Sequence, residues 1–208
     1  MNNNLIDLSA DLKEEEVYAL VDEMIKSSSD PLEILGQARS AMEIVGKRFE
    51  TEEYFIPDLV LAGEILKAIS EKVKPLLKKG EAPQKKGKVL IGTVAGDIHD
   101  IGKDIVTFML DVNGFDVLDL GINVPVQVFV DKVKEFEPQV VGLSGFLTLA
   151  FDSMEKTVRA LEEAGLRNKV KIMIGGGQMD DEVRKYARAD AYGKDAAAAV
   201  NLCKQWIN

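Results

Sequence analysis

Residues 88–104 read KVLIGTVAGDIHDIGKD, and the architecture of the second half of the chain follows from this stretch. The apolar run 88–94 predicts a buried β-strand, and the turn after it leads into an amphipathic segment over 101–113. A strand, a turn and a helix in this order begin a right-handed β-α-β unit. The stretch therefore predicts a parallel sheet with helices packed on its faces.

The same alternation of strand and helix continues to the C-terminus. Further strands are predicted at 115–120, 139–143, 170–174 and 189–192, with helices at 126–136, 150–164, 180–187 and 195–206. Together they predict an α/β domain of flavodoxin-like or Rossmann-like type with a five-stranded parallel sheet. Ligands bind outside the carboxyl ends of the strands in this architecture, so the loops after the strands are where chemistry is expected.

The N-terminal part of the chain has helical rather than strand periodicity. Apolar residues recur at helical spacing from residue 11 to residue 79 and predict a small α-helical bundle. Asp30-Pro31 and Pro57 are start signals for two of its helices. Residues 80–87 mix Gly, Pro and Lys, a composition typical of linkers. We therefore expect a helical domain over 1–79, a linker over 80–87 and the α/β domain over 88–208.

The composition excludes several classes of function. The 208 residues include 26 Lys and Arg against 35 Asp and Glu, a formal net charge of -9, which opposes binding to nucleic acid. No apolar run approaches the roughly 20 residues of a membrane span, and the N-terminus does not resemble a signal peptide. A cytoplasmic protein without membrane contact is expected. With one His and one Cys in the sequence, a zinc site of Cys and His ligands cannot form.

The loop after the first predicted strand contains the chain's one histidine, His99, two residues after Asp97. The glycines of this loop do not have the spacing of a phosphate-binding loop. A carboxylate two residues away can accept a hydrogen bond from one imidazole nitrogen and leave the other free to bind a metal. The alternative is that Asp97 or Asp100 caps the following helix and that His99 is a solvated loop residue.

Two further loops carry motifs at fixed distances from this histidine. The D-x-H-x-x-G motif that begins at Asp97 is followed by 41 residues and then Ser144, and 28 residues separate Phe146 from Gly175. These motifs and spacings resemble the cobalamin-binding domain shared by methionine synthase, corrinoid methyl-carrier proteins and coenzyme-dependent mutases. The family pattern has Leu where this chain has Phe146, and this difference bears on how the nucleotide tail of the cofactor fits.

The resemblance implies roles for residues at the carboxyl edge of the sheet. His99 is the implied lower axial ligand of cobalt, in place of the cofactor's dimethylbenzimidazole, with Asp97 and Ser144 behind it as a proton relay. The detached nucleotide tail is implied to pass Gly145 and the glycines of 175–177, which have no Cβ to obstruct it. The implied cofactor contacts are Gly96, Asp97, Ile98, His99, Asp100, Gly102, Ser144, Phe146, Thr148, Gly175, Gly176, Gly177 and Ala196.

The helical half resembles the cap domain of methionine synthase and of stand-alone corrinoid proteins. The matching stretches begin at Asp30, at Met42 and at Glu53. By this resemblance, Phe49 and Ile56 are the two apolar residues that shield a methyl group on cobalt. The alternative is that both side chains belong to the core of the bundle.

Together the two resemblances imply a carrier of methyl groups. Cobalt(I) of a bound cobalamin or related corrinoid would accept a methyl group from a substrate:corrinoid methyltransferase. A methylcorrinoid:acceptor methyltransferase would remove it, to tetrahydrofolate or a thiol, and a reductive activase is the third implied partner. Such a carrier is one subunit of a multi-component enzyme. The methyl donor stays open among methanol, methylamines, betaines and aryl methyl ethers.

Two other functions use the same cobalamin-binding domain. A cobalamin-dependent sensor usually carries a DNA-binding module, and neither a helix-turn-helix nor a basic face is recognisable once both domains are assigned. A mutase subunit has the same D-x-H-x-x-G motif, but the helical half favours methyl transfer.

Overall fold

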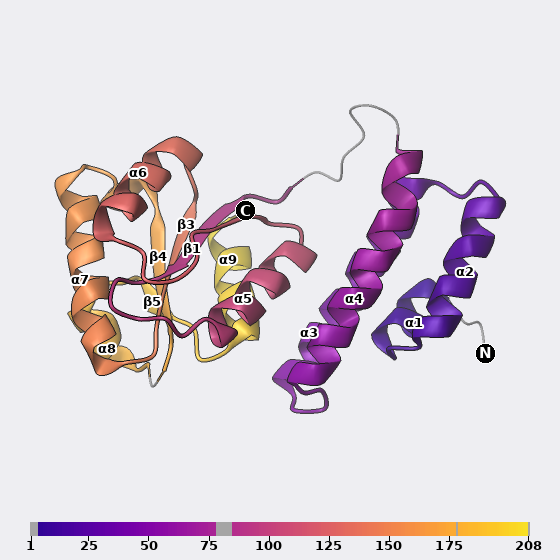
Figure 1. The fold of residues 1–208 in the computed structure, drawn as a ribbon, viewed down its shortest axis with the longest axis horizontal. Coiled ribbons are helices and arrows are strands. Elements are labelled where there is room, and N and C mark those ends of the chain that lie inside the picture. The colour runs from indigo at the N-terminus through magenta and orange to yellow at the C-terminus, as the bar shows by residue number, and fades with distance from the viewer. Residues whose placement is uncertain (1–3, 78–84, 178, 208) are drawn as a thin grey trace. The chain divides into compact units, whose positions relative to one another are not determined.

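The computed structural model describes residues 4–77, 85–177 and 179–207. These residues form two compact units, an N-terminal helical unit and a C-terminal α/β unit (Figure 1). The expected linker over 80–87 lies mostly outside the described residues, so the domain limits at 79 and 88 remain a prediction. No helix among the described residues has the length and apolar character needed to cross a membrane.

The helical unit begins earlier than the helical period of the sequence predicts. Its described helices are α1 (Leu5–Ala10), α2 (Glu14–Lys26), α3 (Pro31–Glu50), α4 (Ile56–Val73) and the short 3-10 helix η1 (Lys74–Leu76). The prediction that helix starts at residue 11 was wrong, because the 6 residues of α1 are too few to show a period. The side chain of Asn4 caps α1 by accepting a hydrogen bond from the N–H of Asp7.

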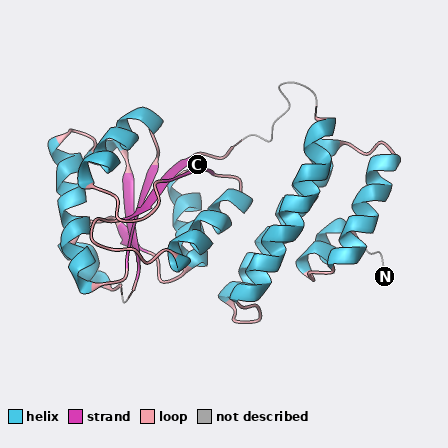
Figure 2. Ribbon diagram, viewed as in Figure 1, coloured by secondary structure: helices cyan, strands magenta, loops and turns pink. Residues whose placement is uncertain are grey.

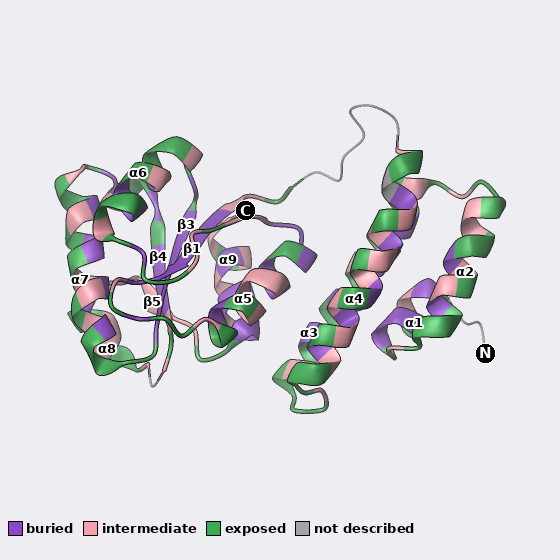
Figure 3. Ribbon diagram, viewed as in Figure 1, coloured by how far each residue is buried: buried purple, intermediate pink, exposed green. Residues whose placement is uncertain are grey.

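Both proline start signals are confirmed in this unit. Asp30 caps α3 by accepting a hydrogen bond from the N–H of Leu32 at 2.9 Å, and Pro31 is the first residue of the helix. Pro57 lies in the first turn of α4. The helices pack around a common apolar core, which appears as the purple stripes in Figure 3. Its buried members are Leu5, Leu8, Val17, Val21, Ile34, Leu35, Ala38, Ile65, Ile69 and Val73.

The α/β unit is built on the predicted five-stranded parallel sheet, and its fold class is confirmed. The strands are β1 (Lys88–Thr93), β2 (Asp116–Asp119), β3 (Val140–Gly145), β4 (Lys171–Gly176) and β5 (Ala191–Tyr192), in the order β2-β1-β3-β4-β5. β3 is buried along its whole length, as a strand covered on both faces should be. The order of the strands is that of flavodoxin-like folds.

Helices cover both faces of this sheet (Figures 1 and 2). One face carries α6 (Val126–Phe136), α7 (Thr148–Glu163) and α8 (Asp181–Tyr186), and the other carries α5 (Ile101–Val112) and α9 (Ala196–Trp206). The short 3-10 helix η2 (Arg167–Lys169) precedes β4. The chain leaves β1 in one direction and β3 in the other, so the topological switch point lies between these two strands. The loops after β1 and β3 therefore meet at the position where this fold binds ligands.

Two adjacent glycines at the end of β4 have different structural requirements. Gly176 has a φ of +127°, and a Cβ there would lie 2.2 Å from the carbonyl oxygen of Gly145 on the neighbouring strand. Among the described residues, a Cβ on Gly175 would meet nothing closer than the carbonyl oxygen of Gly193 at 3.7 Å. Of these two glycines, only Gly176 is required by the close approach of the neighbouring strand.

The two glycines give a matched test of this close approach. Gly176→Ala should lower the free energy of unfolding by roughly 2 kcal/mol or more, because it adds backbone strain to a collision with main-chain atoms. Gly175→Ala should cost less than about 1 kcal/mol. Urea unfolding followed by the fluorescence of Trp206, the one tryptophan of the chain, measures both in the same unit. Equal losses of unfolding free energy in the two variants would contradict the conclusion that only Gly176 is required by the close approach of the strands.

Candidate functional site

The candidate site forms where the carboxyl ends of β1, β3 and β4 lie side by side. The sheet register pairs Thr93 with Ser144 and Ser144 with Gly175, so the three loops that carry the sequence motifs start at the same level. The structure therefore brings together the three motifs that lie far apart in the sequence.

Asp97 is the central residue of this site. Its side chain is fully buried and accepts four hydrogen bonds. Oδ1 accepts from the backbone N–H of His99 at 2.9 Å and lies 2.7 Å from the ring Nδ1 of His99. Oδ2 accepts from the backbone N–H groups of Phe146 and Leu147 at 2.7 and 2.9 Å. One carboxylate thus joins the loop after β1 to the loop after β3.

These hydrogen bonds keep Asp97 ionised. Burial acts to raise its pKa, but the N–H groups of Leu147, His99 and Phe146, together with the His99 ring, outweigh burial and hold the pKa well below the usual range. Leu147 is also the N-cap residue of α7, whose side chain makes no capping hydrogen bond. The Asp97 carboxylate therefore lies at the N-terminus of α7, where the helix dipole favours a negative charge.

The hydrogen bond to Asp97 determines the tautomer of His99. An ionised carboxylate can only accept, so Nδ1 carries a proton, and in the neutral imidazole the lone pair is on Nε2. The side chain of His99 is 49% exposed, whereas that of Asp97 is 0% exposed. The alternative role of Asp97 as a cap of the following helix is not seen, because its described hydrogen bonds go to His99 and to the loop after β3. A half-exposed imidazole is thus held by a buried carboxylate.

A third loop, between β2 and α6, supports the histidine loop, and the sequence motifs gave no sign of it. Asn123 accepts a hydrogen bond from the N–H of Gly96 through its side chain at 2.8 Å, and its own N–H donates to the carbonyl of Asp97 at 3.0 Å. Thr93 donates from its hydroxyl to the carbonyl of His99 at 3.2 Å. Asn123 has a φ of +50°, a conformation that Asn tolerates better than most residues.

Ion pairs of a buried lysine, Lys103, join α5 to the end of β2 beside this loop. The Lys103 ammonium lies 2.5 Å from Asp119 at the end of β2 and 2.6 Å from Asp104, and its side chain is almost fully buried. Burial acts to lower the pKa of Lys103, but the two carboxylates outweigh it and raise the pKa. Lys103 therefore ties the start of α5 to the end of β2.

The proton relay expected from the sequence is not formed in the structure. Ser144 is buried at the end of β3, but among the described residues its hydroxyl makes no hydrogen bond to Asp97. The carboxylate is instead satisfied by the N–H groups of the two residues that follow Gly145. Ser144 thus lies in the site without a described hydrogen bond to the acid that holds His99.

The structure also gives the glycines a different role from the one expected. A Cβ on Gly145 would lie 2.5 Å from the Cβ of Ala150, and one on Gly177 would lie 2.6 Å from the carbonyl oxygen of Phe146. With Gly176, these glycines allow the loop after β3 to approach α7 and the loop after β4. Gly175 is the one of the four where a Cβ would have room, so it alone keeps the expected role of leaving open space.

The other predicted contacts lie around this centre. Ile98 and Gly102 are exposed beside His99, and Asp100 is half-buried between them. Thr148 is the first residue of α7, and Ala196 is the buried first residue of α9. Several large apolar side chains are exposed on the loops after β1 and β3 and on the helices that follow, namely Ile98, Ile101, Phe146, Leu147 and Leu149. Such an apolar surface indicates a binding surface for a large apolar group.

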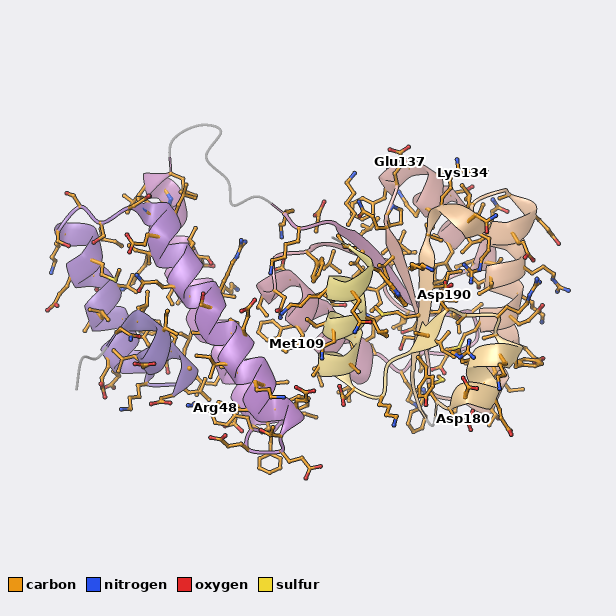
Figure 4. All side chains as sticks on the ribbon, turned by 180° about the vertical axis from the view of Figure 1, so that it is seen from behind. Arg48, Met109, Lys134, Glu137, Asp180 and Asp190 are labelled. Atoms are coloured by element: carbon orange, nitrogen blue, oxygen red, sulfur yellow. The ribbon has the colours of Figure 1, made fainter. Side chains whose placement is uncertain are left out.

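In the helical unit, the residues expected to shield a methyl group are not core residues. Phe49 is half-buried and Ile56 is 46% exposed. Phe55, which the sequence resemblance does not mark, is 64% exposed. Arg48, labelled in Figure 4, holds the turn that carries them: its guanidinium donates to the Tyr54 hydroxyl at 2.8 Å. The alternative of a plain bundle core therefore does not hold for Ile56.

Comparison with known proteins shows the family to which this chain belongs. Residues 87–201 match a family model described as a B12 binding domain, and residues 1–74 match a second model with the same description. The chain belongs to the B12-binding family. Both halves of the sequence resemblance are thereby confirmed, and cobalamin or a related corrinoid is the cofactor of this family.

Relatives within the B12-binding family match along most of their length. Trimethylamine corrinoid protein 1 of Methanosarcina acetivorans is 37% identical over 197 residues, 94% of this chain and 91% of the relative. The dimethylamine corrinoid protein of Methanosarcina barkeri is 36% identical over 204 residues, 98% of this chain and 95% of the relative.

Solved structures of the B12-binding family share the fold. A cobalamin-binding protein from Desulfitobacterium hafniense DCB-2 is 43% identical, with a TM-score of 0.80 over 98% of this chain and 97% of that one. A chain of the methanol:cobalamin methyltransferase complex from Methanosarcina barkeri is 25% identical, with a TM-score of 0.86 over 100% of this chain and 81% of that one.

The residues of this B12-binding chain fit a corrinoid. In its neutral form, His99 offers Nε2, a good ligand for a transition metal, while its other nitrogen is held by Asp97 in the manner usual for metal-binding histidines. The exposed apolar side chains around it suit the flat, largely apolar face of a macrocycle. Gly175 leaves space at the end of β4.

Asn123 provides a test of how the histidine loop is supported. Asn123→Ala should lower the free energy of unfolding by about 1 to 3 kcal/mol, because it leaves the Gly96 N–H without its acceptor and puts Ala at positive φ. Asn123→Asp keeps an acceptor oxygen and should lose less. Urea unfolding of the two variants measures the difference, and an Ala variant as stable as the parent would contradict the support role.

Proposed function

We propose that this chain is the methyl-carrying corrinoid subunit of a multi-component methyltransferase. The geometry of His99 carries the proposal, because a buried carboxylate holds Nδ1 while the rest of the ring remains half exposed. The trimethylamine and dimethylamine corrinoid proteins, matched over most of their length, support it.

We propose different roles for the residues of the site toward the cofactor. A bound corrinoid supplies a cobalt centre that takes a methyl group from one enzyme and releases it to another. His99 would offer Nε2 to cobalt as a ligand, and the hydrogen bond from Nδ1 to Asp97 fixes the tautomer in which Nε2 carries the lone pair. Asp97 keeps its negative charge beside the imidazole, which strengthens His99 as a ligand.

The same contacts keep a proton off Asp97. Its carboxylate accepts four hydrogen bonds from described residues, and they hold its pKa well below the usual range. Nε2 of His99 makes none of these four contacts, and the side chain that carries it is 49% exposed.

The proposed partners are three enzymes. A substrate:corrinoid methyltransferase loads the methyl group, a methylcorrinoid:acceptor methyltransferase removes it, and a reductive activase restores cobalt(I). The similarity to a chain of the methanol:cobalamin methyltransferase complex supports the first. As donor we favour a methylamine over methanol, because relatives named for methylamines are 36% and 37% identical, against 25% for the methanol complex. Methylation assays with methylamine-specific and methanol-specific methyltransferases compare the two donors.

The ligand role of His99 has a direct spectroscopic test. Protein made with ¹⁵N-labelled histidine is loaded with unlabelled cobalamin and reduced to cobalt(II). Because His99 is the one histidine of the chain, a nitrogen splitting that changes from three lines to two on labelling comes from His99 alone. We expect this change in electron paramagnetic resonance spectra at low temperature.

The His99→Ala variant is the control for this measurement. It should show either no nitrogen splitting or the three-line pattern of the cofactor's own benzimidazole, with or without the label. A three-line pattern that persists in the labelled parent protein would show that the benzimidazole remains on cobalt and that His99 is not the ligand.

We propose that residues 1–79 form a cap domain and that residues 88–208 form the cobalamin domain. Residues 80–87 are the proposed linker between them. Phe49 and Ile56 are the cap's proposed shield over the methyl group, with exposed Phe55 as a third member. The double variant Phe49→Ala, Ile56→Ala should shorten the photolysis half-life of bound methylcobalamin at least twofold, because water and oxygen gain access.

Leu76→Ala is the matched control, since it removes an apolar side chain that is 46% exposed, as Ile56 is. Removing the partly buried Phe49 side chain costs stability, up to a few kcal/mol. The half-lives are therefore compared at a temperature where the circular dichroism of variant and parent agree. Equal half-lives would leave Phe49 and Ile56 as structural residues.

A further inference from the structure

Phe146 occupies an unusual position for an aromatic residue. It lies in the loop after β3, is 57% exposed, and stands where the family pattern has Leu. Its ring lies against the imidazole of His99, with ring centroids 4.8 Å apart and planes inclined by 34°. This separation is within the range of attractive contacts between aromatic rings.

The backbone of Phe146 takes part in the same arrangement. Its N–H donates to Oδ2 of Asp97 at 2.7 Å, while Oδ1 of Asp97 holds the ring of His99 at 2.7 Å. Phe146 thus contacts His99 directly through its ring and indirectly through Asp97. Both contacts come from one residue, so the loop that brings the Phe146 backbone to Asp97 also brings its ring to the imidazole.

We propose that Phe146 is a positioning residue that holds the His99 imidazole in the orientation from which Nε2 binds cobalt. This inference rests on the proposed function, in which His99 is the axial ligand. The hydrogen bond to Asp97 fixes one nitrogen of the ring but leaves the ring free to turn about that bond. A flat aromatic face beside the imidazole restricts this turning, and a leucine side chain has no such face.

The expected effect follows from the strength of aromatic contacts. Ordering the imidazole before it binds lowers the entropy lost on ligation, so the ring of Phe146 favours the ligated state. Contacts between aromatic rings change an equilibrium constant by roughly two- to tenfold beyond the area that they bury. Phe146→Leu should therefore shift the ligation equilibrium of His99 by this factor toward the unligated state.

The first measurement uses the protein without cofactor. Because His99 is the one histidine, its imidazole resonances are assigned without ambiguity in protein made with ¹³C- and ¹⁵N-labelled histidine. Relaxation of the ring carbons reports how freely the imidazole moves. We expect a rigid ring in the parent protein and a more mobile one in Phe146→Leu and Phe146→Ala.

The second measurement uses the protein loaded with cobalamin and reduced to cobalt(II), at one fixed pH. The fraction of cobalt that shows the splitting of the labelled His99 nitrogen gives the ligation equilibrium. We expect the equilibrium constant to fall two- to tenfold in Phe146→Leu. This quantity is measured on bound cofactor, so it does not depend on how well the tail fits.

Tyr186→Leu is the matched control, since it replaces an aromatic side chain on α8 that is 54% exposed. The Tyr186 hydroxyl donates a hydrogen bond to Asp152, away from His99 in the described contacts. Tyr186→Leu should leave both readings unchanged. Unchanged imidazole mobility and an unchanged equilibrium constant in Phe146→Leu would overturn the positioning role. A parent protein without His99 splitting would instead contradict the proposed function, while the mobility measurement would still decide whether Phe146 orders the ring.

Discussion

The site depends on one buried negative charge. An ionised carboxylate in the interior is stable only if hydrogen bonds replace the water it has lost, and Asp97 obtains four of them from two loops. Meeting this requirement joins the loop after β1 to the loop after β3 and fixes the tautomer of His99. It also places a negative charge at the start of α7. A single constraint therefore determines both the local structure and the chemical state of the imidazole.

The sheet makes this arrangement possible by bringing the loops to one place. Parallel strands in the order β2-β1-β3-β4-β5 put the ends of β1 and β3 next to each other, although Asp97 and Phe146 are 49 positions apart in sequence. Close packing of the loops then requires glycine where main-chain atoms approach, as at Gly176. The loop after β2 supports this arrangement through Asn123, and the end of β2 supports it through the ion pair of Asp119 with Lys103.

Much of this could be predicted from the sequence, because strands, helices and motif spacing are local patterns. The five-stranded sheet and the D-x-H loop are examples. Helix α1 was missed because it is too short to show a period, and Asn123 because a loop-to-loop hydrogen bond has no sequence signature. The resemblance implied a proton relay through Ser144, but no hydrogen bond between its hydroxyl and Asp97 is described. Backbone N–H groups donate to the Asp97 carboxylate instead. The structure also assigns Gly145, Gly176 and Gly177 to close packing.

The four hydrogen bonds to Asp97 have a consequence for the backbone as well. The amides of His99, Phe146 and Leu147 belong to exposed residues, yet each donates to a buried acceptor. The hydrogens of Phe146 and Leu147 can exchange with deuterated water only when the two loops come apart and release the carboxylate, whereas the His99 amide donates within its own loop. The amides of Phe146 and Leu147 should therefore exchange slowly and at similar rates, like amides of the sheet rather than of a surface loop. The loops after β1 and β3 then open as one cooperative unit.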